Sequence, residues 1–208
     1  ESQETIRNQI RKMGASCDWS RERYTLDKDM SQAVNEAFVR MYNDGLIYRG
    51  NRIVNWCPRC ASTLADDEVK YQEQQGKLYY IKYGPFTVAT TRPETKLADT
   101  GVAVHPNDKR YKKYIGQELD IDLAGHKIKV KVFSDKEVDP EFGSGVVGVT
   151  PAHSATDFAF ATKHKLAIIK LISEDGKILD TGGKYKGLDI VKARDNFVKD
   201  LKSAGQLD

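Results

Sequence analysis

Two short segments of the chain carry residue types that can hold a polar ligand. The first is TTRPET at residues 90–95, and the second is GSGVVGVTPAHSATD at residues 143–157. Threonine hydroxyls, the guanidinium of Arg92 and the carboxylate of Asp157 supply hydrogen-bond donors, acceptors and both signs of charge. On residue types alone, each segment is a candidate wall of a site that binds a polar ligand.

Each segment also has a purely structural interpretation. Thr91 and Glu94 match a capping box, with Pro93 in the first helical turn, where its missing N–H costs nothing. Ser154 and Asp157 likewise match a helix start, and the helix dipole favours a carboxylate in a first turn. Local spacing alone favours the cap over the ligand site in both segments.

The glycines at residues 143–148 match G-x-G-x-x-G, and they nearly match a phosphate-binding loop with Val149 in place of the lysine. Both nucleotide-binding patterns require the glycines to open a helix. Here they lead into β-branched residues and then Pro151, so we predict a strand and reject both interpretations. Gly148 inside this strand indicates a bulge or a group that approaches the backbone closely. We expect His153 to be packed or hydrogen-bonded rather than a ligand or base.

Three cysteines, Cys17, Cys57 and Cys60, argue against a secreted disulfide scaffold, because their number is odd and two of them form a close pair. Cys57 and Cys60 have the spacing of one arm of a zinc knuckle. A structural zinc site needs four ligands, and the chain has no second Cys-x-x-Cys. The pair is therefore half of a zinc site whose other ligands lie outside this chain, or simply two thiols in a turn.

Hydrophobic periodicity predicts a mixed α/β fold. Helices are expected near residues 2–13, after Asp29 or Ser31 up to Gly45, and over residues 154–164 and 189–204. Short β-rich runs punctuated by glycine and proline fill much of the chain beyond residue 73. We predict a small β-barrel-like core decorated by helices at 73–208, preceded at 1–72 by a connecting segment with a long helix and the half zinc knuckle.

Composition excludes several classes of protein. The 208 residues carry a formal net charge of only +3, far from that of a dedicated nucleic-acid wrapper. The lysines of HKIKVKV at 126–132 alternate with apolar residues, which is typical of a half-buried strand with a solvated face. No apolar run reaches membrane-spanning length and no signal peptide opens the chain, so we expect a cytoplasmic location and no membrane partner. Because the chain begins at Glu1, we expect a piece of a longer protein.

Taken together, consecutive segments of the chain resemble the valyl-tRNA synthetases. The segments are GASCDWSRERYTLD, VRMYNDGLIYRGNRIVNWCPRCASTLADDEV, TTRPET, AVHP, GSGVVGVTPAH and KYKGLDIVKARDNFVKDL. They correspond to the inserted connective polypeptide that carries the editing domain, and the isoleucyl enzymes are the next most similar. The HIGH and KMSKS signatures of the synthetases are absent from the chain, so we expect no amino-acid activation.

The resemblance implies an aminoacyl-tRNA ester hydrolase that removes threonine from mischarged threonyl-tRNA(Val). A hydrophobic pocket rejects an added hydroxyl only weakly, a limit for which these synthetases are themselves the standard example, so a second site must hydrolyse the error. Two alternatives remain: editing of valyl-tRNA(Ile) in an isoleucyl-type enzyme, or a non-catalytic module that binds the tRNA acceptor end. The expected partners are the acceptor end of tRNA(Val) and the remainder of the synthetase.

The resemblance also implies site residues. The resemblance implies that Asp157 binds the α-ammonium of the substrate. It also implies that the terminal ribose hydroxyl partly orients the attacking water, and that hydrolysis needs no cofactor. Two positions depart from many valyl sequences, which have lysine at the position of Gly148 and aspartate at that of Ser154. The residues expected to be catalytic are Thr90, Thr95 and Asp157, and those expected to bind substrate are Arg92, Phe142, Thr150, Ser154 and Asp157.

Overall fold

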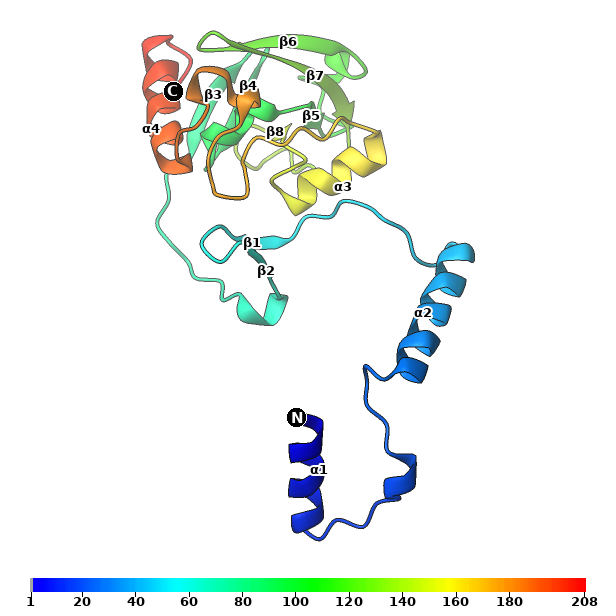
Figure 1. Cartoon of the computed structure of the whole chain (residues 1–208). Coiled ribbons are helices and arrows are strands. Elements are labelled where there is room, and N and C mark those ends of the chain that lie inside the picture. The colour runs from blue at the N-terminus through cyan, green and yellow to red at the C-terminus, as the bar shows by residue number, and fades with distance from the viewer. Residues whose placement is uncertain (1) are drawn as a thin grey trace. The chain divides into compact units, whose positions relative to one another are not determined.

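The computed structural model describes residues 2–208, which divide into two compact units (Figure 1). The first unit ends at Asn51 and contains α1 (Ser2–Lys12), the 3₁₀ turn η1 (Trp19–Arg21) and α2 (Lys28–Asn43). Neither α1 nor α2 has a buried residue. The expected long helix is confirmed, but it starts earlier than predicted. Asp27 caps it by accepting a hydrogen bond from Met30 N, and Gly45 follows its end at φ +72.

The second unit, Arg52–Asp208, opens with an antiparallel hairpin of β1 (Asn55–Cys57) and β2 (Ser62–Leu64), followed by η2 (Asp66–Glu68). Trp56 Nε1 donates a hydrogen bond of 2.8 Å to the carbonyl oxygen of Glu174, which ties the hairpin to a loop far along the chain. The hairpin and its cysteine pair thus belong to the second compact unit.

The remaining strands form two open sheets. A hairpin pairs β3 (Tyr79–Tyr83) with β4 (Phe86–Thr90), and a four-stranded sheet has the order β6-β7-β5-β8. In that sheet β5 is parallel to β7 and antiparallel to β8. Its strands are β5 (Gly101–Val104), β6 (Glu118–Leu123), β7 (His126–Ser134) and β8 (Val146–Val149). The sheets do not close on themselves within residues 2–208, which corrects the expectation of a barrel-like core.

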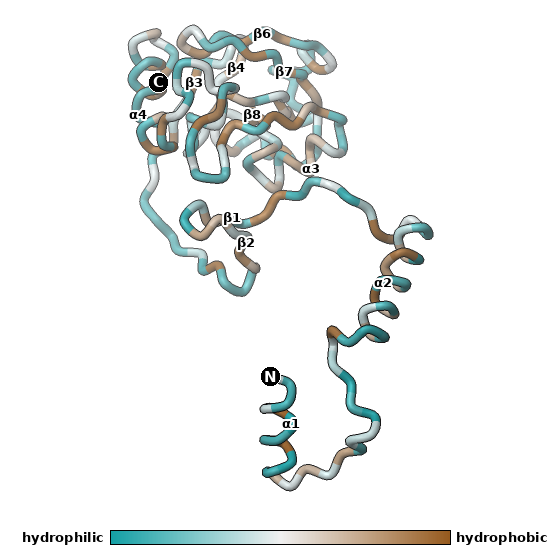
Figure 2. Tube along the Cα trace, viewed as in Figure 1, coloured by the Kyte–Doolittle hydropathy of each residue, from teal (hydrophilic) through white to brown (hydrophobic). Residues whose placement is uncertain are grey.

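Burial follows the alternation of the strand sequences. In β7 the three lysines point to solvent while Val130 and Val132 are buried, as the HKIKVKV pattern predicted. Figure 2 shows β8 as a hydrophobic segment and α1 as mainly hydrophilic. The main core joins both sheets to α4 through residues such as Tyr83, Leu97, Val104 and Phe197.

Two helices flank the sheets of the second unit. α3 (Ala155–His164) and α4 (Ile190–Ser203) lie at opposite ends of them (Figure 1). Both helices occur where the sequence predicted them. Three 3₁₀ helices complete the unit: η3 (Pro93–Ala98), η4 (Lys112–Tyr114) and η5 (Asp180–Tyr185). No helix within residues 2–208 is both long and apolar enough to cross a membrane.

Candidate functional site

The fold brings the two polar segments together. TTRPET connects β4 to η3, and GSGVVGVTPAH contains β8 and leads into α3. Arg92 Nη1 donates to the carbonyl oxygen of His153 at 3.2 Å, across 61 residues of sequence. Lys96 Nζ donates to the carbonyl oxygen of Gly148 at 2.6 Å, across 52 residues. We call residues 90–99 the first wall and residues 148–157 the second wall.

The first wall is shaped by hydrogen bonds between threonines and the backbone of Arg92. Thr90 Oγ1 accepts from Arg92 N at 3.1 Å, and Thr95 Oγ1 donates to Arg92 O at 2.9 Å. Arg92 is the N-cap residue of η3, and it has no side-chain cap hydrogen bond. The capping box predicted for Thr91 and Glu94 is therefore wrong, whereas Pro93 does stand in the first turn.

Glu94 has another partner, which explains why it does not cap the helix. Its side chain is fully buried, and both of its oxygens accept hydrogen bonds of 2.8 Å from the guanidinium of Arg194 in α4. Arg92 Nε lies 3.7 Å from Glu94 Oε1. The hydrogen bond to Glu94 raises the pKa of Arg194. Arg194 thus anchors the first wall to the C-terminal helix.

The second wall positions a carboxylate. Asp157 Oδ2 accepts a hydrogen bond of 2.8 Å from Thr150 N, and Asp157 N donates to Ser154 Oγ at 3.2 Å. Ser154 is the N-cap of α3, as predicted. Among residues 2–208, no hydrogen-bond donor engages Asp157 Oδ1. One oxygen of this nearly buried carboxylate is therefore available to a ligand cation.

A buried polar network joins the two walls. Lys96 Nζ donates to Asp99 Oδ1 and to Thr150 Oγ1, both at 2.9 Å, and Tyr83 OH donates to Asp99 Oδ2 at 3.0 Å. Thr150 Oγ1 also donates to Asp99 Oδ1. Burial raises the pKa of Asp99, and the ammonium of Lys96 opposes that rise. Burial, together with the charge of Asp99, raises the pKa of Tyr83 well above its usual value.

His153 is a structural residue of the second wall, whereas Phe142 lies exposed just before the glycine-rich turn. His153 Nε2 accepts hydrogen bonds from Leu171 N at 2.9 Å and Ile172 N at 3.3 Å. Burial, helped by the charges of Arg92 and Lys170, lowers the pKa of His153 to about 4. His153 is therefore a neutral, structural acceptor at pH 7, which confirms the structural interpretation. Phe142 is 72% exposed and precedes Gly143, whose φ is +61.

The cysteine pair lies at the turn of the β1–β2 hairpin. Cys60 N donates to Cys57 Sγ at 3.4 Å, and this backbone hydrogen bond is the largest cause that lowers the pKa of the Cys57 thiol. Both thiols are free. Within residues 2–208, no cluster of three or more His, Cys, Asp or Glu side chains could hold a metal ion. A zinc site at Cys57 and Cys60 stays a prediction that requires ligands from elsewhere.

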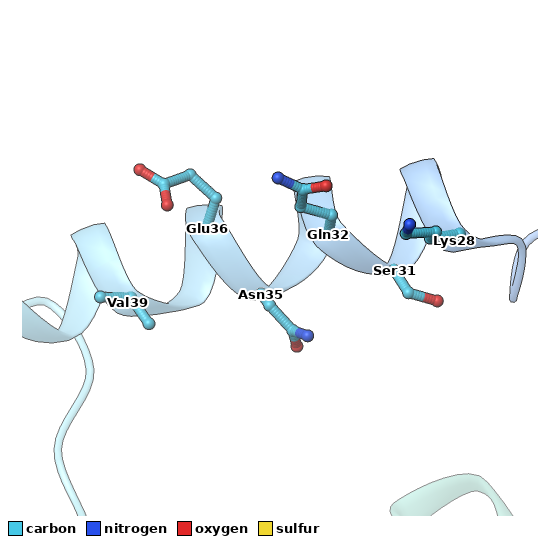
Figure 3. A pocket seen from close by; sticks show the side chains of 6 residues that line it. All are labelled: Lys28, Ser31, Gln32, Asn35, Glu36 and Val39. Carbon is cyan, nitrogen blue, oxygen red and sulfur yellow. The ribbon is translucent and has the colours of Figure 1, made fainter.

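A separate hollow of about 410 Å³ follows the surface of α2 in the first unit (Figure 3). A single helix provides all of its lining, so its groups cannot converge on a ligand from two sides. It is therefore a weaker candidate site than the two walls. The residues that line it are Lys28, Ser31, Gln32, Asn35, Glu36 and Val39.

Sequence reasoning pointed to the two segments that the fold brings together, but it missed the buried residues that join them. Lys96 and Arg194 were not predicted, and neither was Asp99 or Tyr83. The only usable signal was the close backbone approach expected at Gly148, which turns out to come from Lys96 and Asp99 of the same chain. For Arg194, a partner 100 residues away leaves no local pattern.

Comparison with known proteins identifies the class. The family model for class I tRNA synthetases (I, L, M and V) matches residues 1–197, so the chain belongs to that family. Two solved structures share the general arrangement only weakly. One is the ternary complex of Agrobacterium radiobacter K84 agnB2 LeuRS with tRNA and LeuAMS (TM-score 0.47, 16% identity, 99% of this chain and 35% of that one). The other is GlLeuRS-CP1 (TM-score 0.43, 13% identity, 59% of this chain and 82% of that one).

Within that family the chain belongs with the valine–tRNA ligases. It is 52% identical over 208 residues to the ligase of Thermotoga maritima, a match that covers 97% of this chain and 24% of that ligase. It is 51% identical over 209 residues to the ligase of Petrotoga mobilis, with 98% and 24% covered. The chain therefore spans about a quarter of the length of the relatives that it matches.

Proposed function

We propose that the second unit is the editing site of a valine–tRNA ligase, which hydrolyses the aminoacyl ester of threonyl-tRNA(Val). The observation that carries this proposal is Oδ1 of Asp157, which has no hydrogen-bond or ion-pair partner within residues 2–208, in a carboxylate fixed by Thr150 N where the two walls meet. A fixed carboxylate oxygen of this kind suits the α-ammonium of an aminoacyl ester. The partners are the acceptor end of tRNA(Val) and the remainder of the ligase, in the cytoplasm.

The reaction needs positioning more than a strong nucleophile, because an aminoacyl ester is already activated relative to an amide. Water adds its oxygen to the carbonyl carbon, the bond from that carbon to the ribose oxygen breaks, and the ribose oxygen takes a proton. Asp157 holds the ammonium, while Thr90 and Thr95 fix the first wall around the acyl group. The terminal ribose hydroxyl orients the water, and no metal takes part in this hydrolysis.

Selection for threonine requires a group that reads its hydroxyl. Ser154 Oγ accepts a hydrogen bond from Asp157 N, which leaves the serine O–H free to donate. Ser154 therefore replaces the expected aspartate as a reader of the substrate hydroxyl. A valyl group would leave this donor unpaired, and an unpaired buried donor disfavours binding.

Arg92 and Phe142 complete the proposed substrate contacts. The side chain of Arg92 is 45% exposed, and its guanidinium is held by His153 O, so it presents positive charge beside the second wall. Phe142 lies on the exposed loop before β8, and we propose that it packs on the aminoacyl group when the substrate binds. Thr150 contributes through its backbone, because its side chain is engaged in the buried network.

The test is the deacylation of threonyl-tRNA(Val) by the native protein and by Asp157→Asn. Asparagine can still accept from Thr150 N but lacks the charge, so we expect hydrolysis to fall about 10- to 100-fold, as for a lost hydrogen bond to a charged group. The matched control is Asp120→Asn, which changes an exposed carboxylate of β6 and should leave the rate unchanged. Equal rates for Asp157→Asn and the native protein would contradict the role of Asp157.

One observation favours a second candidate, a non-catalytic module that holds the acceptor end. Gly148 and Ser154 stand where the resemblance leads us to expect lysine and aspartate. Salt-sensitive binding of a CCA-end analogue without ester hydrolysis would support that module. A parallel assay with valyl-tRNA(Ile) separates the valyl from the isoleucyl type of editing.

A further inference from the structure

Lys96 is buried, although lysine is rarely buried without partners. Its ammonium has three N–H donors, and all three are used. They reach Asp99 Oδ1 at 2.9 Å, Gly148 O at 2.6 Å and Thr150 Oγ1 at 2.9 Å. Lys96 therefore cannot contact a substrate without losing one of these hydrogen bonds, and any effect on hydrolysis must pass through its partners.

The partners of Lys96 belong to both walls of the candidate site. Asp99 is the C-cap residue of η3, whereas Gly148 and Thr150 lie at the end of β8. Thr150 in turn donates its N–H to Asp157 Oδ2. The ammonium thus fixes Thr150, and Thr150 fixes the carboxylate that is proposed to hold the substrate.

Gly148 is shaped to accept this ammonium. A Cβ atom at position 148 would lie 2.5 Å from Asp99 Oδ2 and 3.3 Å from Lys96 Nζ. No side chain fits there while Lys96 and Asp99 keep their places. A lysine at position 148, which the resemblance leads us to expect, would therefore have to displace the Asp99 carboxylate that now pairs with Lys96.

We propose that Lys96 is a positioning residue of the site, whose ammonium clamps the two walls together and takes the place of the lysine expected at position 148. The proposal rests on the proposed editing function. It predicts that the site needs a cation at this point, and that the cation can be delivered from either wall.

The experiment measures the deacylation of threonyl-tRNA(Val) by the native protein and its variants, with thermal unfolding recorded for each. Lys96→Met removes the ammonium at nearly constant length. The exchange variant, Lys96→Met with Gly148→Lys, returns an ammonium from the second wall, and the Asp99 carboxylate must turn away from the new Cβ to pair with that ammonium. Lys163→Met is the matched control, because it removes a cation from another buried carboxylate, Asp135, outside the walls.

We expect Lys96→Met to lose about 10²-fold in hydrolysis, the effect of a misplacement of about 1 Å at a reacting centre. The exchange variant should recover at least about tenfold of that loss. Gly148→Lys alone should unfold at a lower temperature than both the native protein and the exchange variant. Lys163→Met should hydrolyse at the native rate. Lys96→Met combined with Asp157→Asn should be no slower than Asp157→Asn alone, because both changes act through one carboxylate.

Three results would overturn the proposal. The first is a folded Lys96→Met variant that hydrolyses threonyl-tRNA(Val) within about twofold of native, well below the effect expected of a misplaced group. The second is additive losses for Lys96→Met and Asp157→Asn. The third applies if Lys96→Met does not fold: an exchange variant that folds but does not recover hydrolysis. An absence of hydrolysis by the native protein would instead overturn the proposed function, and the unfolding data would still show whether positions 96 and 148 share one cation.

Discussion

The ion pair between Glu94 and Arg194 gives a sharp test of how the first wall is held. Arg194→Met removes two hydrogen bonds of 2.8 Å from a carboxylate that has 0% side-chain exposure. Breaking a buried pair by removing one partner typically costs about 3–5 kcal/mol. The guanidinium is 33% exposed and Arg92 remains 3.7 Å from Glu94, so solvent and the second cation reduce the cost. We expect a loss of about 2–3 kcal/mol in the free energy of unfolding.

The assay is urea and thermal unfolding followed by circular dichroism. A loss of that size should lower the melting temperature by about 4–12 °C in a unit of this length. Lys186→Met is the control, because its pair with Asp180 is well exposed on both sides and should contribute less than about 1 kcal/mol. Adding Glu94→Gln to Arg194→Met should recover part of the loss by removing the buried charge. If Arg194→Met is no less stable than Lys186→Met, Glu94 does not depend on α4.

Three further changes test the surroundings of the walls. Gly148→Ala should lose about 1–3 kcal/mol in urea unfolding, because its Cβ would lie 2.5 Å from Asp99 Oδ2; a neutral result would contradict the close packing. Hydrogen bonds from His164 and Lys163 outweigh the burial of Asp135 and lower its pKa. The ionised Asp135 carboxylate therefore stabilises the folded protein above about pH 4, and this contribution to the free energy of unfolding is lost as the pH falls. Asp135→Asn should therefore show a smaller drop in urea midpoint between pH 5 and pH 3 than the native protein. An unchanged drop would refute the stabilising role of the ionised Asp135 carboxylate. The pKa of His153 is lowered to about 4, so native stability should decline as the pH falls from about 6.5 towards 4, and His153→Gln should flatten that decline without changing the pH dependence of hydrolysis above pH 6.5.

Local signals predicted local structure well. Ser154 caps α3 as predicted, because a short polar side chain before an amphipathic run satisfies the first free N–H groups, and α4 occupies most of the stretch predicted as helix at 189–204. The glycine-rich segment continues into β8, as its β-branched residues indicated, which eliminates the dinucleotide-binding interpretation.

Partners distant in sequence were the ones that could not be predicted. The T-x-x-E spacing of Thr91 and Glu94 is a genuine cap pattern, yet a bidentate arginine 100 residues away gives Glu94 a stronger partner than a backbone N–H. The resemblance ordered the two segments correctly along the chain. It could not show that they are joined by a buried ammonium, because that lysine does not stand where the family pattern expects it.

Gly148 shows why a site residue should be assigned by the space it fills as well as by its alignment. From the sequence, the glycine meant a bulge or an approaching ligand, and the absence of lysine there suggested weakened recognition of the substrate. In the structure the approaching groups are the Asp99 carboxylate, which would lie 2.5 Å from a Cβ at position 148, and Lys96, whose ammonium would lie 3.3 Å from it and donates to Gly148 O. On our proposal the first wall supplies the charge that the second wall lacks, so the loss of a family residue does not by itself mean the loss of its chemistry. The pair at positions 96 and 148, rather than either residue alone, is therefore the unit to compare between synthetases.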